Sequence, residues 1–345
     1  MQRYRKFIWA LFCVLMICFS GCSLIGISSK PKTIVELYGL IRTKGNQIVD
    51  QNEKPVSLHG MSMFWSQFKE GAKFYNEKCI DWLYKDFNCT VIRAAMGIDG
   101  GGYIANPKVE QEKIFKVIDE CLRLGIYVIV DWHDHRAEKH TEKAVEFFGM
   151  LAQKYGDKPN IIYEIYNEPI KVSWNDVVKP YSESVIKEIR KYDPDNLILV
   201  GNPTWSQDVD AASKDPVNDK NVAYVIHFYS STHKQFLRDK CDVALKNGCA
   251  LFVSEYGITE ASGNGKTDWD ETKLWFNYIK KNNLSTCNWS VADKKETSAS
   301  LMPGANPEGE WKESDLSESG KWNRNYIRIE NAEAFKIIGF SETDN

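Results

Sequence analysis

The sequence lacks the signatures of several protein classes. Its 345 residues contain no low-complexity tract, no long polar run and no repeat of about 20–50 residues, which excludes a disordered chain and a solenoid. No two cysteines have the Cys-x-x-Cys spacing of a zinc site. The glycines of residues 97–103 lack the G-x-G-x-x-G spacing of a dinucleotide-binding loop. What remains is the composition of a folded globular protein, 43% apolar and 26% charged.

Aromatic residues are abundant, at 12% of the chain with 11 tryptophans. A large core accounts for most of them, and a site that stacks flat ligands such as sugar rings is the other explanation. Composition alone does not choose between the two.

The N-terminus has the pattern of an export signal. Three basic residues precede thirteen apolar residues, 7–19, and the stretch "FSGC" follows. This apolar run is too short to span a membrane and is typical of a secretory signal. Because "FSGC" resembles a bacterial lipobox, we expect residues 1–21 to be a signal peptide and Cys22 to carry lipid. Residues 22–36 would then be the lipidated N-terminus and tether of an exported lipoprotein on the cell envelope; simple cleavage and an uncleaved anchor are the alternatives.

The expected mature chain is acidic and has six cysteines. Removing residues 1–21 removes three positive charges and no negative ones, so the net charge changes from −3 to −6. This charge argues against nucleic acid as a partner. We expect most of the six cysteines to be small buried residues, with a Cys79–Cys89 disulfide left open. No amphipathic extension calls for a partner, so a monomer is expected.

Residues 37–342 alternate between strand-like and helix-like segments and predict one α/β domain. Two of the amphipathic stretches are 106–125 and 140–156. Residues 37–55 read as a hairpin, which would cap the bottom of the barrel that the strands below predict. Eight β-branched runs predict parallel strands closed into a (β/α)8 TIM barrel, with a doubly wound open sheet as the alternative. The runs are 55–62, 90–96, 126–133, 161–168, 196–202, 222–229, 250–257 and 285–290.

Polar and aromatic side chains cluster where these runs end. The ends read His59, Arg93, Trp132-His133, Asn167-Glu168, Asn202, His227-Phe228-Tyr229, Glu255-Tyr256 and Trp289. Catalytic groups of such barrels lie at the C-terminal ends of the strands. Two carboxylates at that position, Glu168 and Glu255, are the groups that glycosidic-bond hydrolysis requires.

A third carboxylate, Glu164, precedes Glu168 by four residues on the same predicted strand. The two would share a face and lie about 13 Å apart at roughly 3.3 Å per residue. Glu164 would be deep in the barrel, where a carboxylate needs hydrogen-bond partners. We expect Glu164 to have a structural role.

The stretches "IYEIYNEP", "FVSEYG", "VIVDWHDH", "VIHFYSSTH" and "NWSVADKKE" resemble glycoside hydrolase family 5 over nearly the whole domain. The pattern is similar to subfamily 2, the bacterial endo-β-1,4-glucanases. The resemblance implies a (β/α)8 barrel, a retaining mechanism, a β-glucan substrate and no cofactor. The same machinery acting on mannan, xyloglucan or mixed-linkage glucan is an alternative, and a non-catalytic glycan-binding protein is a third.

The resemblance also implies residue roles. Glu168 would be the general acid/base, with its pKa raised, and Glu255 the nucleophile, kept ionised by Arg93. Asn167 would bond the sugar 2-OH and Tyr229 would orient Glu255. His133 and His227 would donate to the sugar or orient the carboxylates.

Further residues would hold the sugar chain. Trp289 would form the floor beneath the sugar, and the Trp289–Ser290 bond is often cis in the family. Trp205 and Trp65 would stack neighbouring sugars, although the 61–68 loop departs from the subfamily's common form. Lys294 and Glu296 would hydrogen-bond the sugar beyond the cleavage point.

The remaining histidines have no predicted role in the site. His135 and His140 would be solvated, and the context of His59 does not decide whether it faces the cleft. No metal is expected, because the His and Asp side chains of "WHDH" (132–135) lie too close together on one strand end to converge on an ion.

Overall fold

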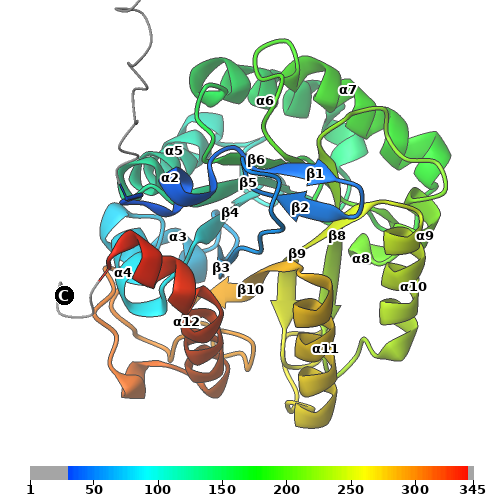
Figure 1. Ribbon diagram of the computed structural model, residues 1–345. Coiled ribbons are helices and arrows are strands. Elements are labelled where there is room, and N and C mark those ends of the chain that lie inside the picture. Colours follow the sequence, from blue (N-terminus) through cyan, green and yellow to red (C-terminus); the bar gives the residue numbers. More distant parts are fainter. Residues whose placement is uncertain (1–29, 341–345) are drawn as a thin grey trace, which may run out of the picture. The chain divides into compact units, whose positions relative to one another are not determined.

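The computed structural model describes residues 30–340, and its residues from Pro31 onward form one compact unit. Eight parallel strands close into a barrel in the order β10-β3-β4-β5-β6-β7-β8-β9, which confirms the predicted (β/α)8 architecture (Figure 1). The strands are β3 (His59–Met63), β4 (Val91–Gly97), β5 (Tyr127–His133), β6 (Ile161–Glu164), β7 (Ile198–Val200), β8 (Val222–Tyr229), β9 (Ala250–Gly257) and β10 (Ser285–Val291).

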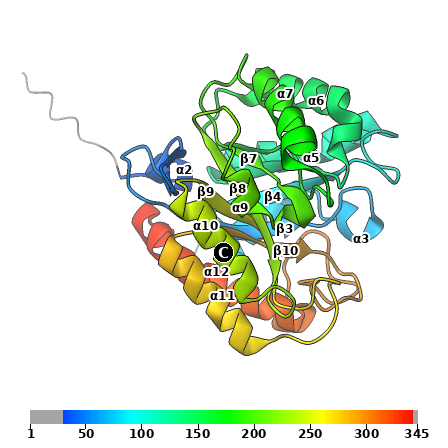
Figure 2. The ribbon, with the colours of Figure 1, turned by 90° about the vertical axis from the view of Figure 1, so that its right-hand side faces the viewer.

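Helices surround the barrel, as expected for parallel strands that are buried on both faces. The longer ones are α4 (Glu77–Phe87), α5 (Pro107–Leu124), α6 (Thr141–Tyr155), α7 (Lys179–Ile189), α10 (Gln235–Lys246), α11 (Trp269–Asn282) and α12 (Glu318–Ile338). Short helical turns are α2 (Ile34–Tyr38), α3 (Lys69–Ala72), α8 (Pro203–Ser206), α9 (Val209–Ala212), Ala137–His140, Trp174–Val178 and Glu313–Asp315. Figure 2 shows α11 and α12 side by side, where Phe276 packs on Trp322 and Tyr326.

The predicted hairpin is present as β1 (Arg42–Lys44) and β2 (Gln47–Val49), which pair antiparallel. The Thr43 amide donates to Asn221 Oδ1, which immediately precedes β8, and Asn46 Nδ2 donates to the Leu245 carbonyl at the end of α10, the helix that leads into β9. The hairpin therefore caps the N-terminal end of the barrel, opposite the strand ends that carry the predicted site.

Two boundaries differ from the sequence-based expectation. The predicted tether, 22–36, overlaps α2, where Thr33 caps the helix and Ile34 is fully buried. An apolar side chain at the helix start anchors this segment to the core, so the folded part begins before residue 37. The predicted signal peptide and Cys22 lie outside the described residues, as does the predicted domain end at 342.

Strand β6 is shorter than predicted and ends at Glu164 instead of residue 168. Beyond it the amides of Asn167 and Glu168 bond to the carbonyls of Trp132 and Asp134, which turns the chain toward β5. On the other side, a Cβ at Gly201 would lie 2.0 Å from the Tyr166 carbonyl oxygen, so only glycine allows this approach. Glu168 is therefore on the loop after the strand.

The six cysteines of the described residues are all buried and free, so Cys79 and Cys89 are not bridged. Among the same residues, no helix combines the length and the apolar character that crossing a membrane requires.

Candidate active site

The predicted polar residues meet at the C-terminal end of the barrel because parallel strands end on one rim. Arg93 lies on β4, His133 ends β5, Asn167 and Glu168 follow β6, His227 and Tyr229 lie on β8, Glu255 on β9 and Trp289 on β10. His59 is the exception, because it opens β3 at the other end and bonds to Thr286 and Ser57. Its placement among the strand ends was wrong.

The two candidate catalytic carboxylates are close together. One oxygen of Glu168 and one of Glu255 lie within 4.8 Å of each other, and His227 Nδ1 lies 2.9 Å from Glu168 and 4.0 Å from Glu255. Carboxyl groups about 5–5.5 Å apart are typical of retaining glycosidases, whereas inverting enzymes keep them about 6.5–9.5 Å apart. The separation therefore fits attack by one carboxylate on the sugar.

Arg93 connects the carboxylates from beneath. Its guanidinium is fully buried and contacts six atoms of five residues: both oxygens of Glu164 (2.8 and 2.9 Å), Asp131 (2.9 Å), Asn167 Oδ1 (2.6 Å), Glu255 Oε2 (3.1 Å) and Ser62 Oγ (3.2 Å). The planar guanidinium group presents its N–H donors in a fixed geometry, which suits bidentate binding of the Glu164 carboxylate. The predicted Arg93–Glu255 contact is thus present, and Glu255 Oε1 also accepts a hydrogen bond from Tyr229 at 2.8 Å.

Glu164 is buried and hydrogen-bonded, as predicted. Besides Arg93, it accepts a bond from Ser254 Oγ at 2.9 Å and lies 3.7 Å from His227 Nε2. His227 Nδ1 is 2.9 Å from Glu168 Oε1, so one imidazole reaches both glutamates. The turn after β6 brings their side chains closer than an extended strand would.

The pKa of Glu168 is opposite to the sequence-based expectation. Burial raises the pKa of Glu168, but hydrogen bonds from His135 and His227 outweigh burial and lower it to about 2. Burial lowers the pKa of His227, yet the charge of Glu255 and bonds to Glu164 and Glu168 raise it to about 9. At neutral pH the proton therefore resides on His227, one hydrogen bond away from Glu168.

The pKa of Glu255 is raised, whereas we expected Arg93 to keep this carboxylate ionised. Burial raises the pKa of Glu255, and the nearby charge of Glu168 adds to this. His227, Arg93 and the Tyr229 hydroxyl act in the opposite direction and favour the ionised form. Arg93 cannot dominate here because it shares its charge with Glu164 and Asp131.

Aromatic rings form the walls of a cleft of about 650 Å³ over Glu168 and Glu255. Trp289 stacks on His133 with ring centres 5.0 Å apart, and Trp65 meets the same imidazole edge-on at 4.1 Å. The Trp289–Ser290 bond is cis, as the resemblance implies. Lys294 and Glu296 form an ion pair on the cleft wall. Trp65, Trp289, Lys294 and Glu296 therefore line the same cleft.

Trp205 lies in an adjoining pocket of about 540 Å³ that also includes Glu168. Thr204, Trp205 and Ser206 all have positive φ, near +60°. A left-handed conformation costs about 1–2 kcal/mol per non-glycine residue, so other bonds must hold it. The Trp205 amide bonds to the Pro169 carbonyl at 2.8 Å, and Ser206 Oγ to the Asn167 carbonyl at 2.7 Å. This turn places Trp205 beside the catalytic loop.

Sequence reasoning missed two residues of the site. His135 is 42% exposed, as the expectation of a solvated side chain implies, but its Nε2 also lies 3.0 Å from Glu168 Oε2. Asp131, two residues before His133 on β5, bonds to His133 Nδ1 at 2.7 Å and to Arg93. The alternation of side chains along β5 was a signal, because 131 and 133 share a face.

His140 was also expected to be solvated, and it is mostly buried between two carboxylates. Its Nδ1 is 2.9 Å from Asp134 and its Nε2 is 3.5 Å from Asp99 on the cleft rim.

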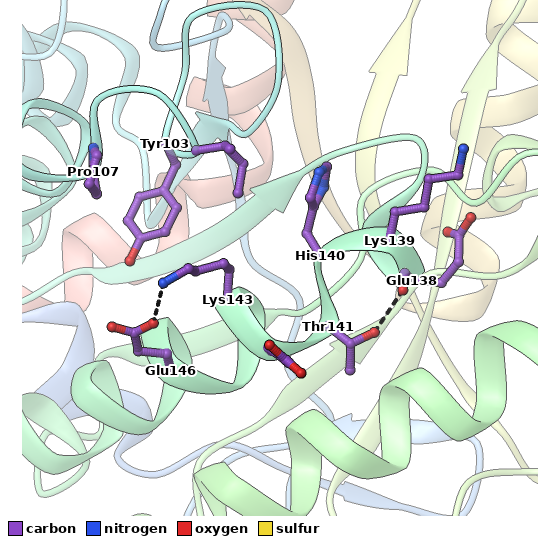
Figure 3. Close-up of a pocket in the computed structure, with 10 residues that line it drawn as sticks. Tyr103, Pro107, Glu138, Lys139, His140, Thr141, Lys143 and Glu146 are labelled. Atoms are coloured by element: carbon purple, nitrogen blue, oxygen red, sulfur yellow. Dashed lines mark hydrogen bonds and ion pairs between the residues drawn. The ribbon is translucent and has the colours of Figure 1, made fainter.

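The side chains of "WHDH" do diverge: His133 faces Asp131, His135 faces Glu168, and Asp134 faces His140. His140 also lines a separate pocket of about 540 Å³, which contains no predicted site residue. Figure 3 shows His140 there with Tyr103, Glu138 and Lys143.

Comparison with known proteins agrees with this geometry. The cellulase family, described as glycosyl hydrolase family 5, matches residues 49–295. Endoglucanase Z of Dickeya dadantii (strain 3937) is 44% identical over 312 residues, 90% of this chain and 70% of that protein. A solved structure from Cytophaga hutchinsonii is 47% identical with a TM-score of 0.87, covering 88% of this chain and 99% of that one.

A second solved structure contains a ligand. The catalytic domain of the Thermobifida fusca endoglucanase, as a variant in complex with cellotetraose, is 31% identical with a TM-score of 0.81. It covers 86% of this chain and 99% of that chain. Family match, sequence identity and barrel geometry agree, and the chain belongs to glycosyl hydrolase family 5.

Proposed function

We propose that this protein is a retaining endo-β-1,4-glucanase that hydrolyses cellulose and related β-glucans. The observation that carries the proposal is the approach of Glu168 and Glu255 to within 4.8 Å in a cleft walled by Trp65 and Trp289. Relatives named endoglucanase and the cellotetraose complex of the Thermobifida fusca enzyme support the substrate class.

In the first step, a Glu255 oxygen attacks the anomeric carbon and forms a glycosyl ester while the bond to the leaving oxygen breaks. Arg93 and Tyr229 hold both Glu255 oxygens and orient the nucleophile. Glu168 delivers a proton to the departing oxygen, and His227 Nδ1, 2.9 Å away, supplies that proton to Glu168.

In the second step, Glu168 accepts a proton from water, and the water oxygen attacks the anomeric carbon. The ester bond to Glu255 breaks, so the sugar leaves with its original configuration. The proton then passes from Glu168 to His227, 2.9 Å away, and the site regains its starting state.

The positions of the side chains give the cleft a direction. Glu168 and Trp205 line the pocket on the leaving-group side, because the acid must face the departing oxygen. Trp289, Lys294 and Glu296 line the other part, which holds the sugar that becomes bound to Glu255. Asn167 Nδ2, buried without a protein partner among the described residues, is free to bond the sugar 2-OH.

The test compares products from carboxymethylcellulose, barley β-glucan, mannan, xyloglucan and xylan. The wild type should cut carboxymethylcellulose internally, and Glu255→Gln should lose at least about 1000-fold in kcat, because no nucleophile remains. Glu333→Gln, an exposed site on α12, is the matched control.

Other outcomes separate the alternatives. A tenfold preference for mannan or xyloglucan would keep the mechanism and replace the substrate. Binding without cleavage by the wild type would replace the enzyme with a glycan-binding protein.

We also propose that the protein is a monomer held on the cell envelope by lipid on Cys22. The basic start, the thirteen apolar residues and "FSGC" support this location. Cells fed a labelled fatty acid should label the wild type and not Cys22→Ser. Equal labelling of both would contradict the anchor, and a dimer in size-exclusion chromatography of the soluble domain would contradict the monomer.

A further inference from the structure

A second groove, of about 670 Å³, lies next to the catalytic cleft. It is formed by the loop after β9 (259–267), the loop after β10 (294–303) and the start of α12 (317–319). Both loops follow barrel strands, so they emerge at the same end of the barrel as the site (Figures 1 and 2). None of the steps proposed above uses this groove.

The chemistry of the groove suits a sugar. Trp269 and Met302 line it and are among the exposed large apolar residues, at 44% and 47% exposure. The remaining lining consists mainly of short hydroxyl and amide side chains and lysines, including Thr267, Asn264 and Lys266. The Trp269 ring packs on Trp322 with centroids 6.3 Å apart and leaves part of the indole open to the groove. A pyranose has an apolar face and polar edges, and a partly exposed indole beside hydrogen-bonding groups matches both.

The backbone beneath Trp269 is held in place. Trp269 is the first residue of α11, and Asp268 caps this helix by accepting a bond from the Glu271 amide at 3.1 Å. The Asp268 amide bonds to Ser231 Oγ at 2.9 Å, and its carboxylate pairs with Lys234 at 2.7 Å. A stacking ring on a fixed backbone loses less entropy on binding than one on a mobile loop.

The groove and the cleft share two residues. Lys294 and Glu296 line both, so the groove begins where the sugar-binding part of the cleft ends. The two loops are joined there, because the Ser298 amide bonds to the Gly263 carbonyl at 2.9 Å. This is the side of Trp289, away from the leaving group. Trp269 lines the groove beyond this shared pair.

We propose that this groove binds the distal glucose units of the chain being cut, with Trp269 as the stacking surface. The inference rests on the proposed glucanase function and extends its binding site beyond Glu296. It makes turnover depend on chain length, since only long substrates span both the cleft and the groove.

The experiment measures kcat/KM for cellotriose to cellohexaose and for an aryl cellobioside. Trp269→Ala should lower kcat/KM for cellohexaose about three- to tenfold, the range expected for one aromatic contact. The aryl cellobioside should be unaffected. Tyr192→Ala is the matched control, because Tyr192 is equally exposed at 46% but precedes β7 at the opposite end of the barrel.

Two results would overturn the inference. The first is an unchanged chain-length profile in Trp269→Ala. The second is an equal loss on all substrates, which would mean that Trp269 supports the cleft. If the wild type cleaves no glucan at all, the proposed function fails instead.

A separate chain on the groove is tested by trapping Glu255 with a 2-fluoro cellobioside. In the trapped protein the cleft is occupied, so a chain bound in the groove would have to be a second, separate chain. If cellohexaose binds to the trapped protein and Trp269→Ala abolishes this binding, the proposal is overturned.

Discussion

At the scale of single residues, Arg93 is the centre of the site. Three carboxylates and the Asn167 oxygen surround one fully buried guanidinium. Removing one partner of such a group leaves uncompensated charge, which costs about 3–5 kcal/mol. The planar geometry of the guanidinium group is therefore as important to the stability of the site as its charge.

Arg93→Lys keeps the positive charge but loses the planar fork, since an ammonium group has three donors at one point. It cannot reach Glu164, Asn167 and Glu255 together. We expect the free energy of unfolding to fall by about 2–4 kcal/mol. We also expect kcat to fall at least about tenfold, with a smaller change in KM, because the nucleophile loses its alignment.

Urea unfolding and steady-state kinetics on carboxymethylcellulose measure the two effects. Arg123→Lys is the control, because Arg123 is 59% exposed and pairs with Glu120 at the helix surface. Equal stability and kcat in Arg93→Lys and the wild type would show that charge alone suffices.

At the scale of elements, the sequence predicts the strands well and the connections poorly. All eight barrel strands and the hairpin were predicted, because apolar β-branched runs bounded by turn residues are a local signal. The end of β6 and the start of the fold at α2 were not. Both depend on contacts with distant segments: the Asn167 amide bonds to the Trp132 carbonyl, and Ile34 packs into the core.

In the candidate site, too, the features with a local sequence signal could be predicted and those that depend on distant segments could not. Glu168, Glu255 and Trp289 could be placed at the rim because each lies among the last three residues of a predicted strand. The pKa of Glu168 could not be predicted, since it depends on His135 and His227 from two other elements. The left-handed turn at Trp205 carries no glycine to mark it, and its support comes from the Pro169 and Asn167 carbonyls.

At the scale of the whole molecule, the barrel buries histidines in opposite environments at its two ends. His227, among carboxylates at the open end, has its pKa raised to about 9. His59, at the closed end, has its pKa lowered to about 3 by burial. A raised pKa stabilises the folded state below the ordinary value of 6.5 and loses this effect as the pH rises through 9. A lowered histidine pKa has the reverse effect, so stability falls as the pH drops below 6.5.

The free energy of unfolding should therefore decrease between pH 6.5 and 9, where the folded protein keeps the His227 proton and the unfolded chain has lost it. One proton corresponds to about 1.4 kcal/mol per pH unit, or roughly 3 kcal/mol over this interval. Urea unfolding of the wild type at pH 6, 7, 8 and 9 measures the slope. His227→Gln should flatten it, whereas His59→Gln should change only the acidic side, below pH 6.5. An alkaline slope that survives in His227→Gln would place the titrating proton on another group and contradict the assignment of His227 as the proton reservoir of Glu168.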